Sequence, residues 1–127
     1  LEWLHTYTFP EELKFRSKSY ADEVAAFFFD EMARMGTTAV QSFATTHPHS
    51  VEAFFEEALR RDARVLCGLT GIDREGTAPD DYRDTPESFY EGSKSLIERF
   101  HERGRCLYAI TPRFSFGSTD AQMKAAQ

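Results

Sequence analysis

A guanidinium and an aromatic ring stand side by side directly after an apolar stretch near the end of the chain. Residues 107–110 are apolar, Pro112 follows, and Arg113 and Phe114 come next. Proline cannot donate a ladder hydrogen bond, so Pro112 is predicted to end the pairing of a strand. Parallel α/β proteins bind ligands at the carboxyl ends of strands. Arg113 offers a planar fork of donors and Phe114 a stacking face, which predicts recognition of a flat ligand; a surface arginine beside a core phenylalanine is the alternative.

A second group with possible chemistry is the H-x-H sequence His47-Pro48-His49, which follows a predicted strand. This spacing is known from metal sites, but two histidines cannot complete a zinc site. The other two histidines of the chain, His5 and His101, lie far from this loop in the sequence. We therefore expect no metal site within the chain, and assign His47 to lining a loop or pocket.

Acidic residues give weaker indications. Asp73 follows the second predicted strand and would lie at the same end of the sheet as Arg113, although a solvated loop acid is the more common situation. Glu11-Glu12 and Glu56-Glu57 are charge pairs typical of solvated faces. The chain has no Cys-x-x-Cys, nucleophile elbow or P-loop motif. The residues thus predict one ligand-facing sheet edge and no complete catalytic set.

Amphipathic helices and strand-like stretches alternate along most of the chain and would position these residues. Helices are predicted over about 19–35, 50–61 and 85–103 and from 118 onward, with Ser19, Ser50, Thr85 and Ser118 as their caps. Strands are predicted over 37–43, 65–70 and from 107, with an irregular stretch over 1–9 and a polar loop over 71–84. About three βα units with a parallel sheet follow from this order. Both an open doubly wound sheet and a barrel segment have this pattern, although no phosphate-binding glycine fingerprint supports a dinucleotide fold.

Composition excludes several classes of protein. The chain has 127 residues and a net charge of -6, which argues against non-specific binding to nucleic acid. No stretch approaches the roughly 20 consecutive apolar residues of a membrane span. Cys67 and Cys106 lie in apolar surroundings, as reduced core thiols do, which favours the cytoplasm. A complete eight-fold barrel needs about 250 residues. Because the chain lacks an initial Met and a final helix cap, we expect a piece of a longer protein.

Four short motifs occur in the order and at the intervals found in guanine deaminases of the amidohydrolase superfamily. They are Trp3-Leu4, Tyr7-Thr8-Phe9-Pro10-Glu11, Gly36-Thr37-Thr38 and Thr111-Pro112-Arg113-Phe114-Ser115. The chain resembles that family over essentially its whole length. The resemblance implies a hydrolase of purine catabolism that converts guanine to xanthine and ammonia. It further implies a metal-dependent (β/α)8 barrel of the TIM type, with residues 1–127 as part of its single catalytic domain.

The resemblance also implies where the chemistry is located. In that family a zinc-bound water attacks the purine carbon that bears the exocyclic amine, and a glutamate shuttles protons. The family's metal ligands and glutamate would lie outside this chain, so we expect no catalytic residue and no metal ligand within it, and no activity of the isolated chain. Arg113 and Phe114 match the pair that holds the purine. Trp3, His47 and Thr111 are expected near the pocket.

Two alternatives remain open at this point. One is another amidohydrolase, such as an aminohydrolase or chlorohydrolase, which acts on a different heterocycle and needs a different pair in place of Arg113 and Phe114. The other is a non-catalytic α/β binding domain that is complete in itself. In each case we expect a small-molecule ligand rather than nucleic acid or membrane, and a homodimer would be compatible with the sequence.

Overall fold

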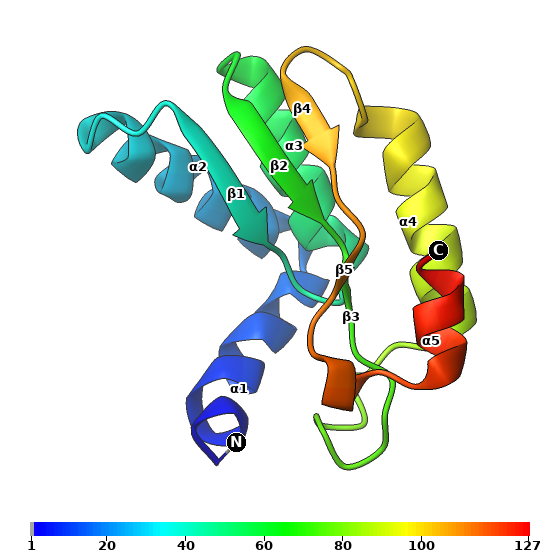
Figure 1. Ribbon diagram of the computed structural model, residues 1–127. Coiled ribbons are helices and arrows are strands. Elements are labelled where there is room, and N and C mark those ends of the chain that lie inside the picture. Colours follow the sequence, from blue (N-terminus) through cyan, green and yellow to red (C-terminus); the bar gives the residue numbers. More distant parts are fainter. Residues whose placement is uncertain (1) are drawn as a thin grey trace.

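The computed structural model describes residues 2–127 as alternating helices and parallel strands (Figure 1). A helical run opens the chain and consists of η1 (Leu4–Thr8), α1 (Phe9–Glu12) and η2 (Leu13–Arg16). The elements that follow are α2 (Lys18–Arg34), β1 (Ala39–Phe43), α3 (Pro48–Arg60), β2 (Arg64–Gly68), β3 (Thr70–Gly71), α4 (Pro86–Phe100), β4 (Cys106–Tyr108), β5 (Thr111–Pro112), η3 (Ser115–Gly117) and α5 (Asp120–Ala125). None of the described helices is long and apolar enough to cross a membrane.

Every strand pair in the described chain is parallel, as the alternation of helices and strands predicts. Strand β2 lies between β1 and β4, so that Val65 is paired with both Val40 and Cys106. Farther along, β3 pairs with β5, and Gly71 lies opposite Pro112. Pro112 is therefore the last paired residue of its strand, which confirms the position predicted for it.

The strand predicted over residues 65–70 is divided in two, and Gly68 lies at the division. A Cβ atom at this position would stand 1.7 Å from the carbonyl oxygen of Ala109. The amide of Ala109 donates to the carbonyl of Cys67 at 2.9 Å, which holds the two backbones in this close approach. Only glycine fits such an approach. Strands β3 and β5 consequently form a short ladder of their own, and this ladder leads to Arg113.

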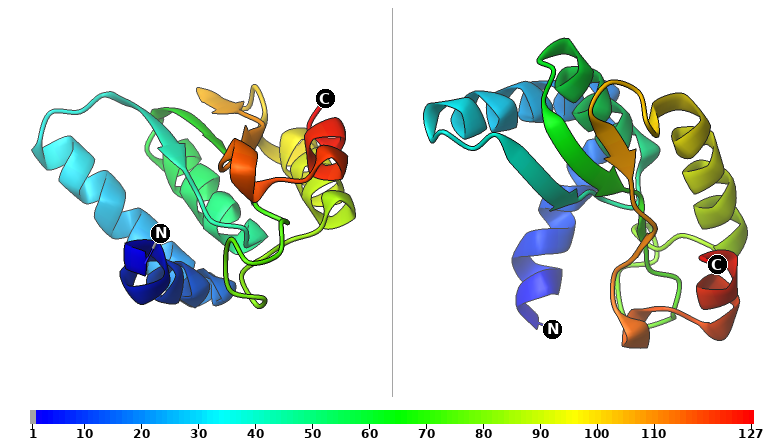
Figure 2. Two further views of the ribbon diagram at one scale, coloured as in Figure 1. Left: turned by 60° about the horizontal axis from the view of Figure 1, so that its bottom comes forward. Right: turned by 45° about the horizontal axis from the view of Figure 1, so that its top comes forward.

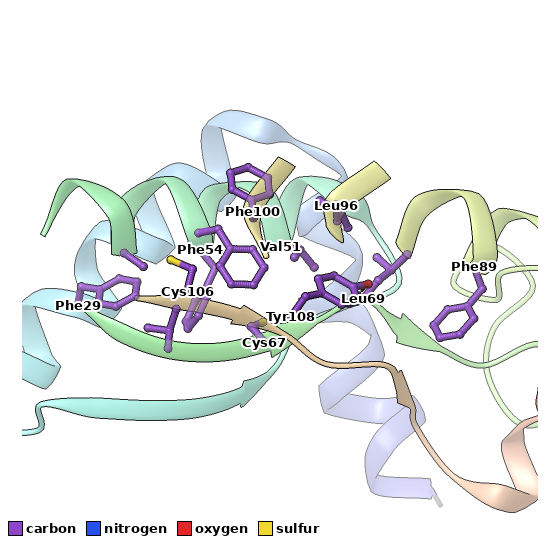
Figure 3. Close-up of a cluster of buried hydrophobic side chains, with 13 residues drawn as sticks. Phe29, Val51, Phe54, Cys67, Leu69, Phe89, Leu96, Phe100, Cys106 and Tyr108 are labelled. Carbon is purple, nitrogen blue, oxygen red and sulfur yellow. Dashed lines mark hydrogen bonds between the residues drawn. The ribbon is translucent and has the colours of Figure 1, made fainter. Parts of the chain in front are cut away.

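The main hydrophobic core fills the space between the three-stranded sheet and helices α3 and α4, which lie on the same face of it (Figure 3). Phe55 of α3 stacks on Phe100 of α4, with ring centroids 5.3 Å apart. The buried hydroxyl of Tyr108 donates to Oγ of Ser93 at 2.9 Å and accepts the N–H of Leu69 at 3.0 Å. These two bonds tie β4 to α4 and to the link between β2 and β3.

The opposite face of the sheet is not covered by any of residues 2–127. Leu107, which alternates with the buried Cys106 and Tyr108 along β4, is 39% exposed, and Phe43 at the end of β1 is 64% exposed. A barrel carries its helices on the outer face alone, whereas a doubly wound sheet carries them on both faces. The arrangement is consistent with a segment of a barrel wall.

The helix starts differ from their predicted positions at three of four caps. Thr85 caps α4 as predicted, and Pro86 follows it at the first helical position. Ser17 rather than Ser19 caps α2, and Thr119 rather than Ser118 caps α5. Helix α3 starts at Pro48, two residues before Ser50, because the fixed φ angle of proline suits the first helical position. Ser50 instead donates its hydroxyl hydrogen to the carbonyl of His47 at 2.8 Å.

The N-terminal stretch was predicted to be irregular, and this was wrong. Residues 4–16 form a helical run, in which His5 packs edge-on against Phe9 at 5.2 Å between ring centroids. Phe9 is fully buried in a second, smaller core with Ile72, Ala78 and Tyr82. Long-range burial of one aromatic side chain thus overrides the weak local pattern. This run and the segment after β5 both extend beyond the carboxyl ends of the strands (Figures 1 and 2).

Candidate functional site

Arg113 lies where the sequence predicts it, just past the carboxyl end of a parallel strand. Its backbone N–H donates to the carbonyl of Gly71 at 2.8 Å. This bond belongs to the last ladder pair, Gly71 with Pro112, and fixes the direction in which the side chain leaves the strand. The side chain is only 14% exposed, so the guanidinium is not a surface group. The alternative of a surface arginine is therefore wrong for this chain.

The guanidinium of Arg113 makes a two-point ion pair with Glu12. Nη1 donates to Oε2 at 2.5 Å, and Nη2 donates to Oε1 at 2.9 Å. Nη1 also donates to the hydroxyl of Tyr82 at 2.9 Å. The Tyr82 hydroxyl in turn donates to Oε2 of Glu12, so that the three side chains form a closed network. Glu12 is 19% exposed, and the expectation that it lies on a solvated face was wrong.

Aromatic rings surround this network on several sides. The guanidinium carbon of Arg113 lies 5.2 Å from the ring centroid of Phe9, 5.8 Å from that of Tyr82 and 5.7 Å from that of Phe114. Phe114 stacks on Phe116 at 5.1 Å, with an interplanar angle of 14°. Cations over ring faces are stabilised by the ring quadrupole. The predicted pair, Arg113 and Phe114, is thus brought together at one place.

The charges within the network reinforce one another. Burial by itself lowers the pKa of Arg113, but the hydrogen bonds from its guanidinium to Glu12 outweigh this effect and leave the pKa raised. Burial, together with the nearby Glu12 carboxylate, raises the pKa of Tyr82, so its phenol stays protonated and can donate. A buried charge is tolerated when it is paired and its hydrogen bonds are satisfied. Glu12 supplies that partner for Arg113.

His47 lies beside this network but does not form a metal site. Its Nε2 accepts a hydrogen bond from Nε of Arg16 at 3.0 Å, and its ring centroid lies 6.0 Å from that of Tyr82. Burial and the neighbouring Arg16 charge lower the pKa of His47, which keeps the ring neutral. His49 instead pairs with Glu52 through Nδ1 at 3.1 Å. Within residues 2–127 no group of three His, Cys, Asp or Glu side chains could hold a metal ion, so a resident metal does not fit these residues.

The remaining predicted residues have other surroundings. The hydroxyl of Thr111 donates to the carbonyl of Leu69 at 2.7 Å, so it reinforces the short β3–β5 ladder. Trp3 is 65% exposed on the N-terminal run and precedes Glu12 by about two and a half helical turns. Asp73 accepts the backbone N–H of Thr119 at 2.7 Å and holds the start of α5, away from the Arg113 network.

Sequence reasoning missed Glu12 and Tyr82. Tyr82 carries a weak signal, because it is the only aromatic residue in the acidic loop over residues 71–84, and an aromatic side chain has a large apolar area to bury. Glu12 carries none, since its partner lies 101 positions away. The network contains an acceptor-binding cation and a stacking ring, while its only carboxylate is occupied. A cation and a stacking ring at one place suit a flat ligand that carries hydrogen-bond acceptors.

Known proteins resemble this chain in both sequence and fold. The chain is 49% identical over 127 residues to guanine deaminase of Escherichia coli (strain K12), covering 100% of the chain and 28% of that protein. It is 38% identical over 125 residues to a probable guanine deaminase of Deinococcus radiodurans, covering 98% of the chain and 28% of that protein. No family model matches the chain. The chain spans about 28% of the length of these relatives.

Solved structures show the same similarity. A crystal structure of guanine deaminase from Bradyrhizobium japonicum superposes with a TM-score of 0.96 at 48% identity, covering 99% of this chain and 27% of that one. Guanine deaminase from C. acetobutylicum, solved with guanine bound in the active site, superposes with a TM-score of 0.92 at 27% identity, covering 99% of this chain and 30% of that one. The resemblance to guanine deaminases, which the four motifs indicate, is thereby confirmed across the whole chain.

Proposed function

Since this chain corresponds to one segment of guanine deaminases, we propose that the complete protein hydrolyses guanine to xanthine and ammonia. The observation that carries the proposal is the 49% identity to an E. coli guanine deaminase over all 127 residues. The relatives and structures named above are all guanine deaminases or a probable one. This favours the proposal over a different heterocycle hydrolase and over a non-catalytic binding domain.

The part of the reaction assigned to this chain is the binding of the purine ring. Arg113 would donate to acceptor atoms on the edge of the base, and Phe114 would lie against its face. Guanine offers two neighbouring acceptors, O6 and N7, which match a planar donor fork. His47 and Thr111 would lie beside Arg113 and Phe114 and line the pocket or support it, and Trp3 would line the pocket from the N-terminal run. No group of this chain is assigned a catalytic step.

We propose that the chain is part of the wall of a single (β/α)8 catalytic domain and that zinc is held by residues outside it. The one-sided cover of the sheet by α3 and α4 supports the barrel, and the lack of a ligand set within residues 2–127 supports an outside metal. On this proposal the isolated chain is inactive. Two free, buried cysteines favour a cytoplasmic enzyme of purine catabolism. The complete protein would act on a small molecule, without nucleic acid or membrane, and a homodimer is compatible with it.

The test is guanine-to-xanthine turnover by the complete protein that carries this sequence, with and without a chelator. Arg113→Ala is expected to lower kcat/KM at least about tenfold, or about 1.4 kcal/mol, because a recognition contact is lost. Arg60→Ala is the matched control, since Arg60 is exposed and, among residues 2–127, forms an ion pair only with Glu57 of the same helix. Metal-dependent hydrolysis of another heterocycle, without hydrolysis of guanine, would contradict the proposal that guanine is the substrate. Absence of any hydrolysis would favour a binding domain.

A further inference from the structure

We propose that Glu12 and Tyr82 are positioning residues that present a single edge of the Arg113 guanidinium to the substrate. This inference rests on the proposed function and adds to it the residues that set the orientation of the recognition group. Both would act only through Arg113.

The first step of the argument is a count of hydrogen-bond donors. A guanidinium carries five N–H groups. Both N–H groups of Nη1 are used, one by Glu12 and one by Tyr82, and one N–H of Nη2 is used by Glu12. Two remain, the N–H of Nε and the second N–H of Nη2, and neither has an acceptor among residues 2–127. In the planar group these two hydrogens point in the same direction and form one side-on fork.

The second step concerns how firmly this orientation is held. Glu12 comes from the N-terminal helical run, Tyr82 from the loop over residues 71–84, and Arg113 from the end of β5. The Tyr82 ring packs on Phe9 at 4.9 Å between centroids, and its hydroxyl also donates to Glu12. The two hydrogen bonds to Glu12 prevent the guanidinium from rotating within its own plane. Three separate elements thus fix which edge remains free.

The third step identifies the ligand class. Two parallel N–H groups suit two neighbouring acceptors in one plane, such as the O6 and N7 atoms of an oxopurine. An aminopurine offers N7 beside an amino donor, so one N–H of the fork would face a donor. If Glu12 were absent, all end-on N–H groups would become free and the arginine could turn. The fixed edge would then be lost together with its preference for an oxopurine.

The experiment compares three variants of the complete protein with the unsubstituted protein. Glu12→Gln keeps the shape of the side chain but removes the two-point ion pair. Tyr82→Phe keeps the ring packed on Phe9 but removes the hydroxyl. Glu11→Gln is the matched control, because Glu11 lies on the same helical turn, is exposed and, among residues 2–127, forms an ion pair only with Lys14.

The expected result is a change in KM rather than in kcat. Glu12→Gln should raise KM for guanine about tenfold and Tyr82→Phe about threefold, with kcat nearly unchanged, because binding away from the reacting carbon is lost. Glu11→Gln should change neither constant. A merely structural role of Glu12 would instead lower the amount of active enzyme, and so kcat, at constant KM.

A double-mutant cycle tests whether Glu12 acts through Arg113. In a protein that already carries Arg113→Ala, Glu12→Gln should cause no further loss, because residues that act as a unit are not additive. Additive losses, or an unchanged KM in Glu12→Gln, would overturn the inference. If Glu12→Gln does not fold, as judged by circular dichroism, Tyr82→Phe tests the inference instead. A rise of about threefold in its KM would support the inference, and an unchanged KM would overturn it. Absence of guanine turnover by the unsubstituted protein would overturn the proposed function itself, before any variant is compared.

Discussion

Asp84 binds both backbone polar groups of Ile72. Oδ1 of Asp84 accepts the N–H of Ile72 at 2.9 Å, and the N–H of Asp84 donates to the carbonyl of Ile72 at 3.2 Å. Oδ1 also accepts from the side chain of Gln122 at 2.8 Å, whereas the buried Oδ2 has no partner among residues 2–127. Ile72 directly follows Gly71, whose carbonyl fixes the backbone of Arg113. This carboxyl group therefore holds the strand end from which Arg113 and Phe114 extend.

Replacement of Asp84 by Asn should change how stability depends on pH. Burial raises the pKa of Asp84 from 3.8 to about 6, so the folded state binds more protons than the unfolded state between these values. The contribution of Asp84 to stability is therefore fully present below about pH 4 and is lost as the pH rises through about 6. Asp84→Asn should remove this loss, leaving the thermal midpoint unchanged at low pH and raising it at neutral pH. An equal slope in both proteins, measured by thermal unfolding across this range, would show that Asp84 does not titrate there.

Gly68→Ala should strongly destabilise the protein. The new Cβ would stand 1.7 Å from the carbonyl oxygen of Ala109, a backbone atom whose residue is held close by the hydrogen bond from its amide to Cys67. We expect a loss of at least about 2 kcal/mol in the free energy of unfolding. Gly76→Ala is the comparison, because its Cβ meets nothing within 4 Å and only its positive φ of 76° opposes the change. Urea titration measures the free energy of unfolding of both variants. Similar losses at the two positions would mean that the close approach at Gly68 does not cause the destabilisation.

Tyr108→Phe tests the buried hydroxyl that links β4 to α4. The substitution leaves the N–H of Leu69 without its acceptor and the hydroxyl of Ser93 without its donor. An unsatisfied buried polar group costs about 1–3 kcal/mol, and we expect a loss of unfolding free energy in this range. Tyr90→Phe on α4 is the control, because Tyr90 is about half exposed. A loss no larger in Tyr108→Phe than in Tyr90→Phe would show that the two hydrogen bonds contribute nothing net.

The sequence predicts the parts of the fold that depend on local chemistry. Alternating helices and strands led to a parallel sheet, Thr85-Pro86 to a helix start, and Pro112 to a strand end. The location of Arg113 and Phe114 followed from the same logic, because the strands of a parallel sheet have their carboxyl ends at one edge.

What the sequence could not predict depends on contacts between distant segments. Glu12 has an acidic neighbour, and nothing in the local sequence distinguishes it from Glu11. Only the folded chain brings it against Arg113. In the same way, the helical form of residues 4–16 depends on the burial of Phe9 against Tyr82, which the sequence places 73 positions apart (82 − 9). Local periodicity carries no information about such pairs.

The ion pair between Glu12 and Arg113 closes a loop that spans 101 positions. Bringing two such distant residues together costs chain entropy, and this cost must be offset before the contact gives any net stabilisation. Contacts between sequence neighbours within each βα unit form earlier for the same reason. We therefore expect the Glu12–Arg113 pair to form late in folding, so that a chain that has folded only in part carries Arg113 without its fixed direction. On the proposed function, the selectivity of Arg113 therefore depends on a contact between two segments that lie far apart in the sequence.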